Sequence, residues 1–145
     1  MSEHPNAQRV RALFQAFRER DVQAIRDALA EDAVLVQAIR DALAEDAVWH
    51  FPGRSGQLAG SHAGRDAILA FLARVAQLSE GSFELDLEDV LANDACAVAL
   101  FRGRARRNGR RLDNPTCLKI RLSEGRAVEI WEFVWDLPAV EAFWS

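Results

Sequence analysis

The spacing of apolar residues predicts three amphipathic helices in the first half of the chain. Between residues 7 and 20, apolar residues recur every three or four positions, the spacing of one helix face: Val10, Leu13, Phe14 and Phe17. Similar spacing continues over about 22–45 and over 65–78. A short strand over 47–51 is predicted between the second and third helices, and a loop over 54–64 follows it.

The second half of the chain reads as four long strands. They are predicted over about 82–91, 95–106, 110–122 and 126–135. Asn108-Gly109, between two of them, is a strong signal for a two-residue hairpin with a type I′ turn. Helices followed by a meander of strands predict an α+β fold, with three helices from the N-terminal half packed on a strongly curved antiparallel sheet. No linker divides residues 1–145, so one domain is expected.

The second predicted helix contains a tandem repeat. Residues 22–34 and 36–48 share the sequence VQAIRDALAEDAV, so the 14-residue units are 22–35 and 36–49. Fourteen helical steps return to within about 40° of the starting direction, so a lengthened helix keeps its apolar face. The alternative docks one copy and loops out the other. Because copy two leads directly into the strand over 47–51, we expect it to keep the place near the sheet.

Two consequences of this duplication stay open. It can have no function, or it can extend a helix that projects and promotes domain swapping or altered oligomerisation.

Composition narrows the class of protein. Half of the 145 residues are hydrophobic and 28% are charged, which suits a soluble domain, and no apolar run is long enough to span a bilayer. No secretory signal is visible, and two cysteines, Cys96 and Cys117, suit a reduced cytoplasmic protein. The net charge of −4 argues against general nucleic-acid binding. The six arginines between residues 102 and 111 allow a phosphate patch, but a solvated or salt-bridged hairpin is favoured.

Four short segments occur in a distinctive order along the chain. They are Phe14-x-x-Phe17, the segment AEDAVWHFPG at 44–53, Gly64-Arg65-Asp66-Ala67-Ile68, and Gly125-Arg126-x-Val128-x-x-Trp131-Glu132-Phe133. In this order they resemble the SnoaL-like and ketosteroid-isomerase-like branch of the nuclear transport factor 2-like superfamily. The resemblance implies a cone-shaped pocket between helices and sheet, and a homodimer. It does not imply one reaction, because this fold supports many.

The resemblance also implies that the catalytic residues of two family activities are absent from this sequence. The isomerase base position holds Phe51, and the position of its tyrosine proton donor holds Phe17; the chain contains no tyrosine. The second donor falls near Asp113-Asn114-Pro115. The last-strand aspartate of the family's epoxide hydrolases corresponds to Phe133. Neither activity is therefore expected in its standard form.

Two side chains are candidates for acid–base chemistry. Glu132 shares one face of the last predicted strand with Val128, Ile130 and Val134. This predicts a carboxylate in apolar surroundings with a raised pKa. His62 lies just before the third helix, near where the family's pocket opens. The alternatives are a salt bridge for Glu132 and a packed or solvated loop histidine for His62. His50 is expected on the far side of the sheet, at an interface or in a structural role.

The remaining candidates are binding residues. An aromatic set would wall a cavity for a flat hydrophobic ligand, or fill it completely: Phe14, Phe17, Trp49, Phe51 and Phe71. Asn114 and Thr116 would supply hydrogen bonds. The histidines and cysteines fit no metal-ligand spacing, and no cofactor motif is present, so neither metal nor cofactor is expected.

The sequence thus supports two hypotheses. The first is a cofactor-independent protein acting by proton transfer on a small hydrophobic molecule, polycyclic or carbonyl-bearing. The second is a non-catalytic small-molecule binder or dimeric accessory module of the same fold. No nucleic-acid or membrane partner is expected.

Overall fold

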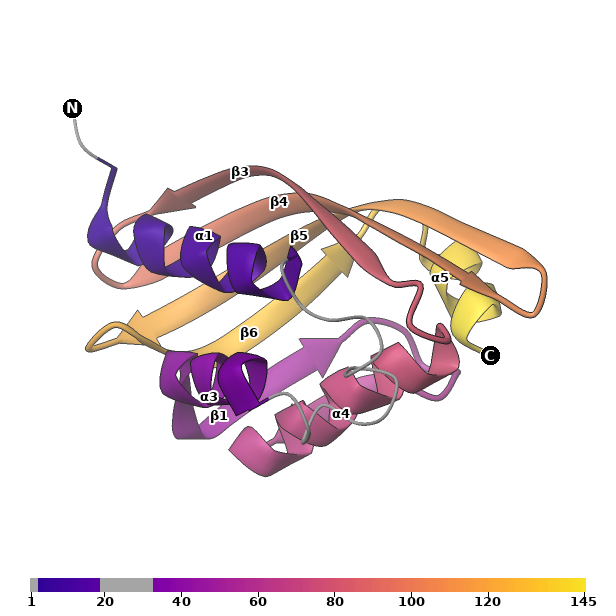
Figure 1. Ribbon diagram of the computed structural model, residues 1–145, viewed down its shortest axis with the longest axis horizontal. Coiled ribbons are helices and arrows are strands. Elements are labelled where there is room, and N and C mark those ends of the chain that lie inside the picture. The colour runs from indigo at the N-terminus through magenta and orange to yellow at the C-terminus, as the bar shows by residue number, and fades with distance from the viewer. Residues whose placement is uncertain (1–2, 19–32) are drawn as a thin grey trace.

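The computed structural model of the protein describes residues 3–18 and 33–145. Six strands form one curved sheet in the order β2-β1-β6-β5-β4-β3 (Figure 1). Their bounds are β1 Leu43–Phe51, β2 Gly60–Ala63, β3 Glu84–Ala92, β4 Cys96–Arg107, β5 Arg110–Ser123 and β6 Arg126–Val134. The described helices are α1 Pro5–Arg18, α3 Ala33–Ala42, α4 Arg65–Leu78 and α5 Leu137–Trp144.

The four long strands form the predicted antiparallel meander. Tight hairpins connect β4 to β5 and β5 to β6. In the first hairpin Asn108 and Gly109 both have positive φ, 51° and 75°, which is the conformation of the predicted type I′ turn. Burial alternates along β4 and β5, so one face of each strand is directed into the protein.

The sheet differs from a wholly antiparallel one at β1, which lies parallel to β6. Leu43 pairs with Ala127 at the start of this ladder, so the second helix ends at Ala42 rather than near residue 45. Pairing with β6 and burial of Leu43 therefore override the helix propensity of the segment that follows Ala42. The predicted loop over 54–64 also contains a strand, β2, which pairs antiparallel with β1.

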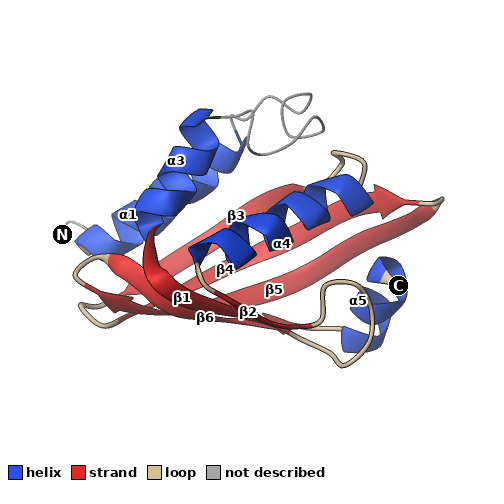
Figure 2. Ribbon diagram, turned by 90° about the horizontal axis from the view of Figure 1, so that it is seen from below, coloured by secondary structure: helices blue, strands red, loops and turns tan. Residues whose placement is uncertain are grey.

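Helices α1, α3 and α4 cover the concave face of the sheet (Figure 2). Each directs apolar side chains inward: Val10 and Phe14 from α1, Ile39 from α3, and Ile68 and Phe71 from α4 are all buried. Burying these faces stabilises helices that would be marginal alone. No helix in the described ranges is long and apolar enough to cross a membrane.

Helix α5 was not predicted from the sequence, although its capping signal is present there. The Asp136 side chain accepts a hydrogen bond from the Ala139 backbone N–H, and Pro138 lies in the first turn. Two arginines of the β4–β5 hairpin bond its last carbonyl oxygens: Arg107 donates to Phe143 and Ser145, and Arg110 donates to Ala142.

The other arginines of that hairpin are partly paired with acids. Arg102 forms an ion pair with Asp113, and Arg104 contacts both Asp86 and Asp113. Arg102 and Arg104 therefore form the salt bridges that were favoured for this hairpin over a phosphate patch.

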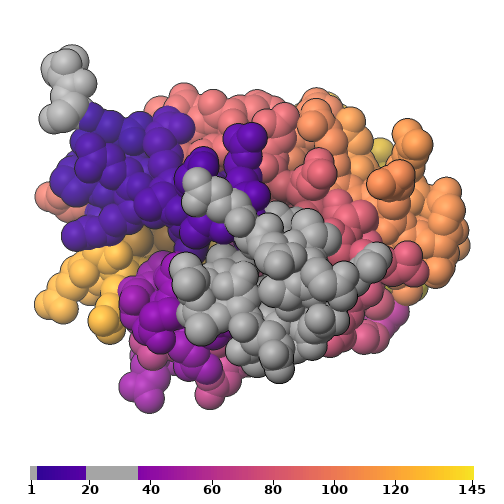
Figure 3. Space-filling model, viewed as in Figure 1, coloured from indigo at the N-terminus to yellow at the C-terminus, as the bar shows by residue number. Residues whose placement is uncertain are grey.

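The second repeat copy, 36–49, forms most of α3 and the first part of β1. In the space-filling view of Figure 3, α3 lies beside α1 at one end of the molecule. Copy one falls mainly in 19–32, outside the described residues, as does the expectation of a projecting helix.

Candidate functional site

A cavity of about 180 Å³ lies between the helices and the concave face of the sheet. Its walls come from all four described helices and from five of the six strands, and they are mostly apolar. Eight of the residues singled out from the sequence line it: Phe14, Phe17, Trp49, Phe51, Phe71, Asn114, Thr116 and Glu132. The aromatic set therefore walls a cavity rather than filling the interior completely.

Phe71 of α4 is at the centre of the aromatic wall. Its ring centroid lies 5.4 Å from that of Trp49 and 5.6 Å from that of Phe51, both on β1. Tilted aromatic pairs at such separations add to the stability gained from burial alone. These contacts fix α4 against β1, on the side of the sheet that borders the cavity.

Glu132 is the only acidic side chain among the described residues that line the cavity. It projects from β6 between Ile130 and Val134 on the same face, opposite Leu118 of β5. Its side chain keeps some accessible surface because it borders the cavity, but protein surrounds it on the other sides. The indole N–H of Trp49 donates to Oε1 over 3.2 Å.

This environment changes the acidity of Glu132. Removal of water from the carboxylate raises its pKa from an ordinary 4.5 to about 7, and the Trp49 hydrogen bond opposes part of that rise. Near neutral pH the side chain is thus present both as an acid and as a base. The carboxylate thus lies in the apolar surroundings expected from strand alternation, and no arginine in the described part of the chain forms an ion pair with it.

Asn114 and Thr116 are buried on the cavity face of β5, but they bond mainly to each other and to nearby backbone. Asn114 Nδ2 donates to Thr116 Oγ1 over 3.3 Å and to the Pro115 carbonyl over 3.1 Å. Asn114 Oδ1 accepts from the backbone N–H of Asp136 over 3.2 Å, which connects β5 to the start of α5. These bonds position the wall of the cavity.

His62 lies beside the aromatic wall, on the edge strand β2. It pairs with Trp49 across the two strands, stacks on Phe71 with ring centroids 4.3 Å apart, and its Nε2 donates to the Leu58 carbonyl over 3.0 Å. It is not among the residues that line the cavity. His62 and Glu132 therefore do not line the cavity together, and a catalytic role for His62 stays a prediction.

His50 faces the opposite side of the sheet, as expected. Its ring nitrogens lie 2.7 Å from Glu129 Oε2 and 2.7 Å from Ser61 Oγ, and the ring stacks on Trp131. The hydrogen bond with His50, together with that from Arg121, lowers the pKa of Glu129. This network stabilises the outer face and has no contact with the cavity.

Comparison with known proteins identifies the family to which this chain belongs. Residues 35–130 match the model of the SnoaL-like domain. The chain belongs to the SnoaL-like family. An uncharacterised protein of Mycobacterium tuberculosis, strain H37Rv, is 32% identical over 146 aligned residues, which cover all of both chains.

Solved structures of the same fold agree with this SnoaL-like assignment. Bal32a, from a soil-derived mobile gene cassette, matches with a TM-score of 0.78 and 30% identity, covering 97% of this chain and 96% of that one. A putative SnoaL-like polyketide cyclase from Jannaschia gives a TM-score of 0.69 at 20% identity over 100% and 97% of the two chains. TerC, co-crystallised with polyporic acid, gives 0.73 at 20% identity over 97% and 98%.

Several cavity residues of this SnoaL-like protein were missed at the level of sequence. Phe101 lines the cavity from β4, and Val140 and Trp144 line it from α5. Strand alternation could have identified Phe101, because it shares its face with Ala99 and Ala105. The α5 residues could be found only after that helix was recognised. Within the described ranges, no group of three or more histidine, cysteine or acidic side chains is arranged to hold a metal ion.

Proposed function

We propose that this SnoaL-like protein binds a small hydrophobic, carbonyl-bearing molecule in its cavity and moves a proton through Glu132. One observation carries the proposal: a single carboxyl group borders an apolar cavity, and its pKa is raised to about 7. General acid–base catalysis is most effective when the pKa of the group lies near the working pH. A cavity of about 180 Å³ is comparable to the ~150 Å³ that accommodates benzene in a dry protein interior.

The proposed step follows from the geometry at Glu132. Trp49 holds Oε1, so Oε2 is the atom that would meet the ligand. The ionised carboxylate would take a proton from the carbon next to the carbonyl, leaving an enolate. The protonated acid would return a proton to that carbon or to the enolate oxygen.

Two proteins of the same fold support the class of ligand. One is a putative SnoaL-like polyketide cyclase, and the other was co-crystallised with polyporic acid. At 20% identity each shares the fold with this chain, and neither identifies the ligand of this chain.

The test uses indanone, a compact aromatic ketone, in deuterated buffer at neutral pH. We expect indanone to raise the melting temperature of the wild type, and NMR to show exchange of the protons next to its carbonyl. Glu132→Gln should keep the thermal shift and lower the exchange rate about 100-fold or more, because glutamine cannot accept the proton. Glu88→Gln, which changes an exposed glutamate on β3, should behave as the wild type does.

The same experiment separates the two hypotheses. Binding without Glu132-dependent exchange would favour the non-catalytic binder, and no binding at all would contradict the proposal. His62→Ala adds a further comparison: if exchange is lost there but persists in Glu132→Gln, the acid–base role belongs to His62.

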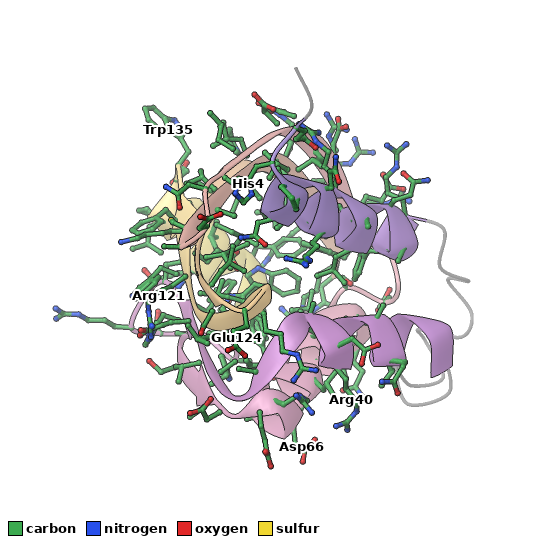
Figure 4. The ribbon with its side chains drawn as sticks, turned by 90° about the vertical axis from the view of Figure 1, so that its left-hand side faces the viewer. His4, Arg40, Asp66, Arg121, Glu124 and Trp135 are labelled. Atoms are coloured by element: carbon green, nitrogen blue, oxygen red, sulfur yellow. The ribbon has the colours of Figure 1, made fainter. Side chains whose placement is uncertain are left out.

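We also propose that the protein forms a homodimer through the outer face of β5 and β6. Apolar side chains are unusually exposed there: Phe133 is 53% exposed and Trp135, which directly follows β6, is 84% exposed. Figure 4 shows the Trp135 side chain pointing away from the protein. Trp131 lies on the same face, with Lys119 Nζ 4.9 Å from its ring centroid. Exposed aromatic patches of this kind are typical of protein interfaces.

Light scattering should therefore give twice the 16.2 kDa mass of the chain. Phe133→Glu should produce a monomer, because it places a charge in the centre of the buried face. Leu91→Glu, which alters a side chain that is 56% exposed on the edge strand β3, should leave the mass unchanged. A monomeric wild type at micromolar concentration would contradict the dimer.

A cytoplasmic location remains part of the proposal. Cys96 and Cys117 are both free, which suits a reducing compartment.

A further inference from the structure

The cavity has an opening near the start of α1, where a positive charge lies. Arg9 is exposed to solvent and also lines the cavity, so its side chain lies at the mouth. Asn6, Leu122 and Gly125 border the same end. Figure 4 views the molecule from this side and labels Glu124 of the adjoining β5–β6 turn.

A short chain of hydrogen bonds holds the Arg9 side chain. Arg9 Nη1 donates to Asn6 Oδ1 over 2.7 Å. Asn6 is only 5% exposed, and its Nδ2 donates to the carbonyl oxygens of Asn93 and Asp94 over 3.0 and 3.4 Å. A side chain at Gly125, where φ is +79°, would collide with the guanidinium. The buried Asn6 amide therefore holds this arginine at the mouth, beside the Gly125 turn.

No carboxylate in the described part of the chain forms an ion pair with Arg9, whose hydrogen-bond acceptor is the neutral amide of Asn6. Arg11, two residues further along α1, shows the contrast, because it pairs with both Glu3 and Asp89. A guanidinium has five N–H donors, and a planar carboxylate can accept two of them in parallel. The mouth thus presents a positioned, uncompensated cation beside an apolar interior.

We infer that the cavity favours apolar molecules that carry a carboxylate, with the apolar body inside and the carboxylate at Arg9. This inference rests on the proposed function, since it requires that the cavity bind a ligand. The opposite orientation would bring the ligand carboxylate towards Glu132, where two like charges would repel. Arg9 therefore determines both the class of ligand and its direction in the cavity.

The test compares two probes of nearly the same shape, para-ethylbenzoate and para-ethylbenzyl alcohol, by calorimetric titration at pH 7.5. The wild type should bind the carboxylate about fivefold more tightly, the effect of one solvent-exposed ion pair. Arg9→Met keeps an unbranched apolar stem and should abolish this preference while changing the affinity for the alcohol less than about twofold. Added salt should reduce the preference in the wild type.

Arg126→Met is the matched control, because Arg126 is an exposed arginine next to Gly125 that does not line the cavity. It should retain the preference for the carboxylate. Equal binding of the two probes to the wild type, or a preference that persists in Arg9→Met, would overturn the inference and leave the proposed function standing. Failure of both probes to bind would overturn the inference together with the proposed cavity function.

Discussion

Glu132→Gln should be more stable than the wild type by about 3 kcal/mol at pH 8.5, and by less than about 1 kcal/mol at pH 5. The reason is the burial of an ionisable group without an opposite charge. The difference between an ordinary pKa of 4.5 and about 7 corresponds to roughly 3 kcal/mol between the two protonation states. Glutamine has almost the same shape and does not ionise, so it avoids this cost.

The direction of the pH dependence follows from which state binds more protons. Between pH 4.5 and about 7 the unfolded chain releases the Glu132 proton, whereas the folded protein retains it. Rising pH therefore favours the unfolded state throughout this window. The contribution of Glu132 to stability is fully present below pH 4.5 and is lost as pH rises through about 7.

Urea unfolding at several pH values between 5 and 8.5 measures this effect as the difference between variant and wild type. The other ionisable groups are common to both proteins, so their contributions largely cancel in that difference. Glu88→Gln should give a flat difference across the same range, because its carboxylate is exposed on β3. A flat difference for Glu132→Gln as well would mean that its carboxylate is hydrated in the folded protein, and the acid–base proposal would lose its basis.

The features that could be predicted from sequence depend on local, periodic signals. Alternation along β6 was sufficient to direct Glu132 towards the apolar side, and Asn108-Gly109 was sufficient to fix the turn of its hairpin. The helix face of α1 likewise placed Phe14 and Phe17 at the cavity. In each case the pattern of one segment determines which side chains face inward.

The features that could not be predicted depend on contacts between distant segments. Parallel pairing of β1 with β6 sets where α3 ends, and nothing within residues 36–49 encodes that partner. His62 resembled a cavity residue by its position before α4, but its ring stacks on Phe71 and does not line the cavity. The place of Arg9 at the mouth also could not be predicted, because Arg9 lies there beside Gly125, which is far along the chain.

Phe71 connects the parts of the structure that surround the cavity. It is 5% exposed and contacts Trp49 and Phe51 of β1 and His62 of β2. We therefore expect Phe71→Ala to lower the free energy of unfolding by about 3–5 kcal/mol, the usual cost of removing a buried aromatic ring. Phe71→Leu should cost less, because leucine retains much of the apolar contact.

The cost of Phe71→Ala should be partly recovered by a ligand, which distinguishes its role from that of an ordinary core residue. Truncation enlarges the existing cavity, so an apolar ligand can occupy the vacated space and stabilise the folded state by mass action. Urea unfolding with and without saturating indanone measures both effects, and Leu91→Ala, at an exposed site, should change stability by less than about 0.5 kcal/mol. A loss below about 1 kcal/mol for Phe71→Ala would show that α4 is held against β1 by other contacts. A full loss without recovery by indanone would show that neighbouring side chains fill the space vacated by the ring.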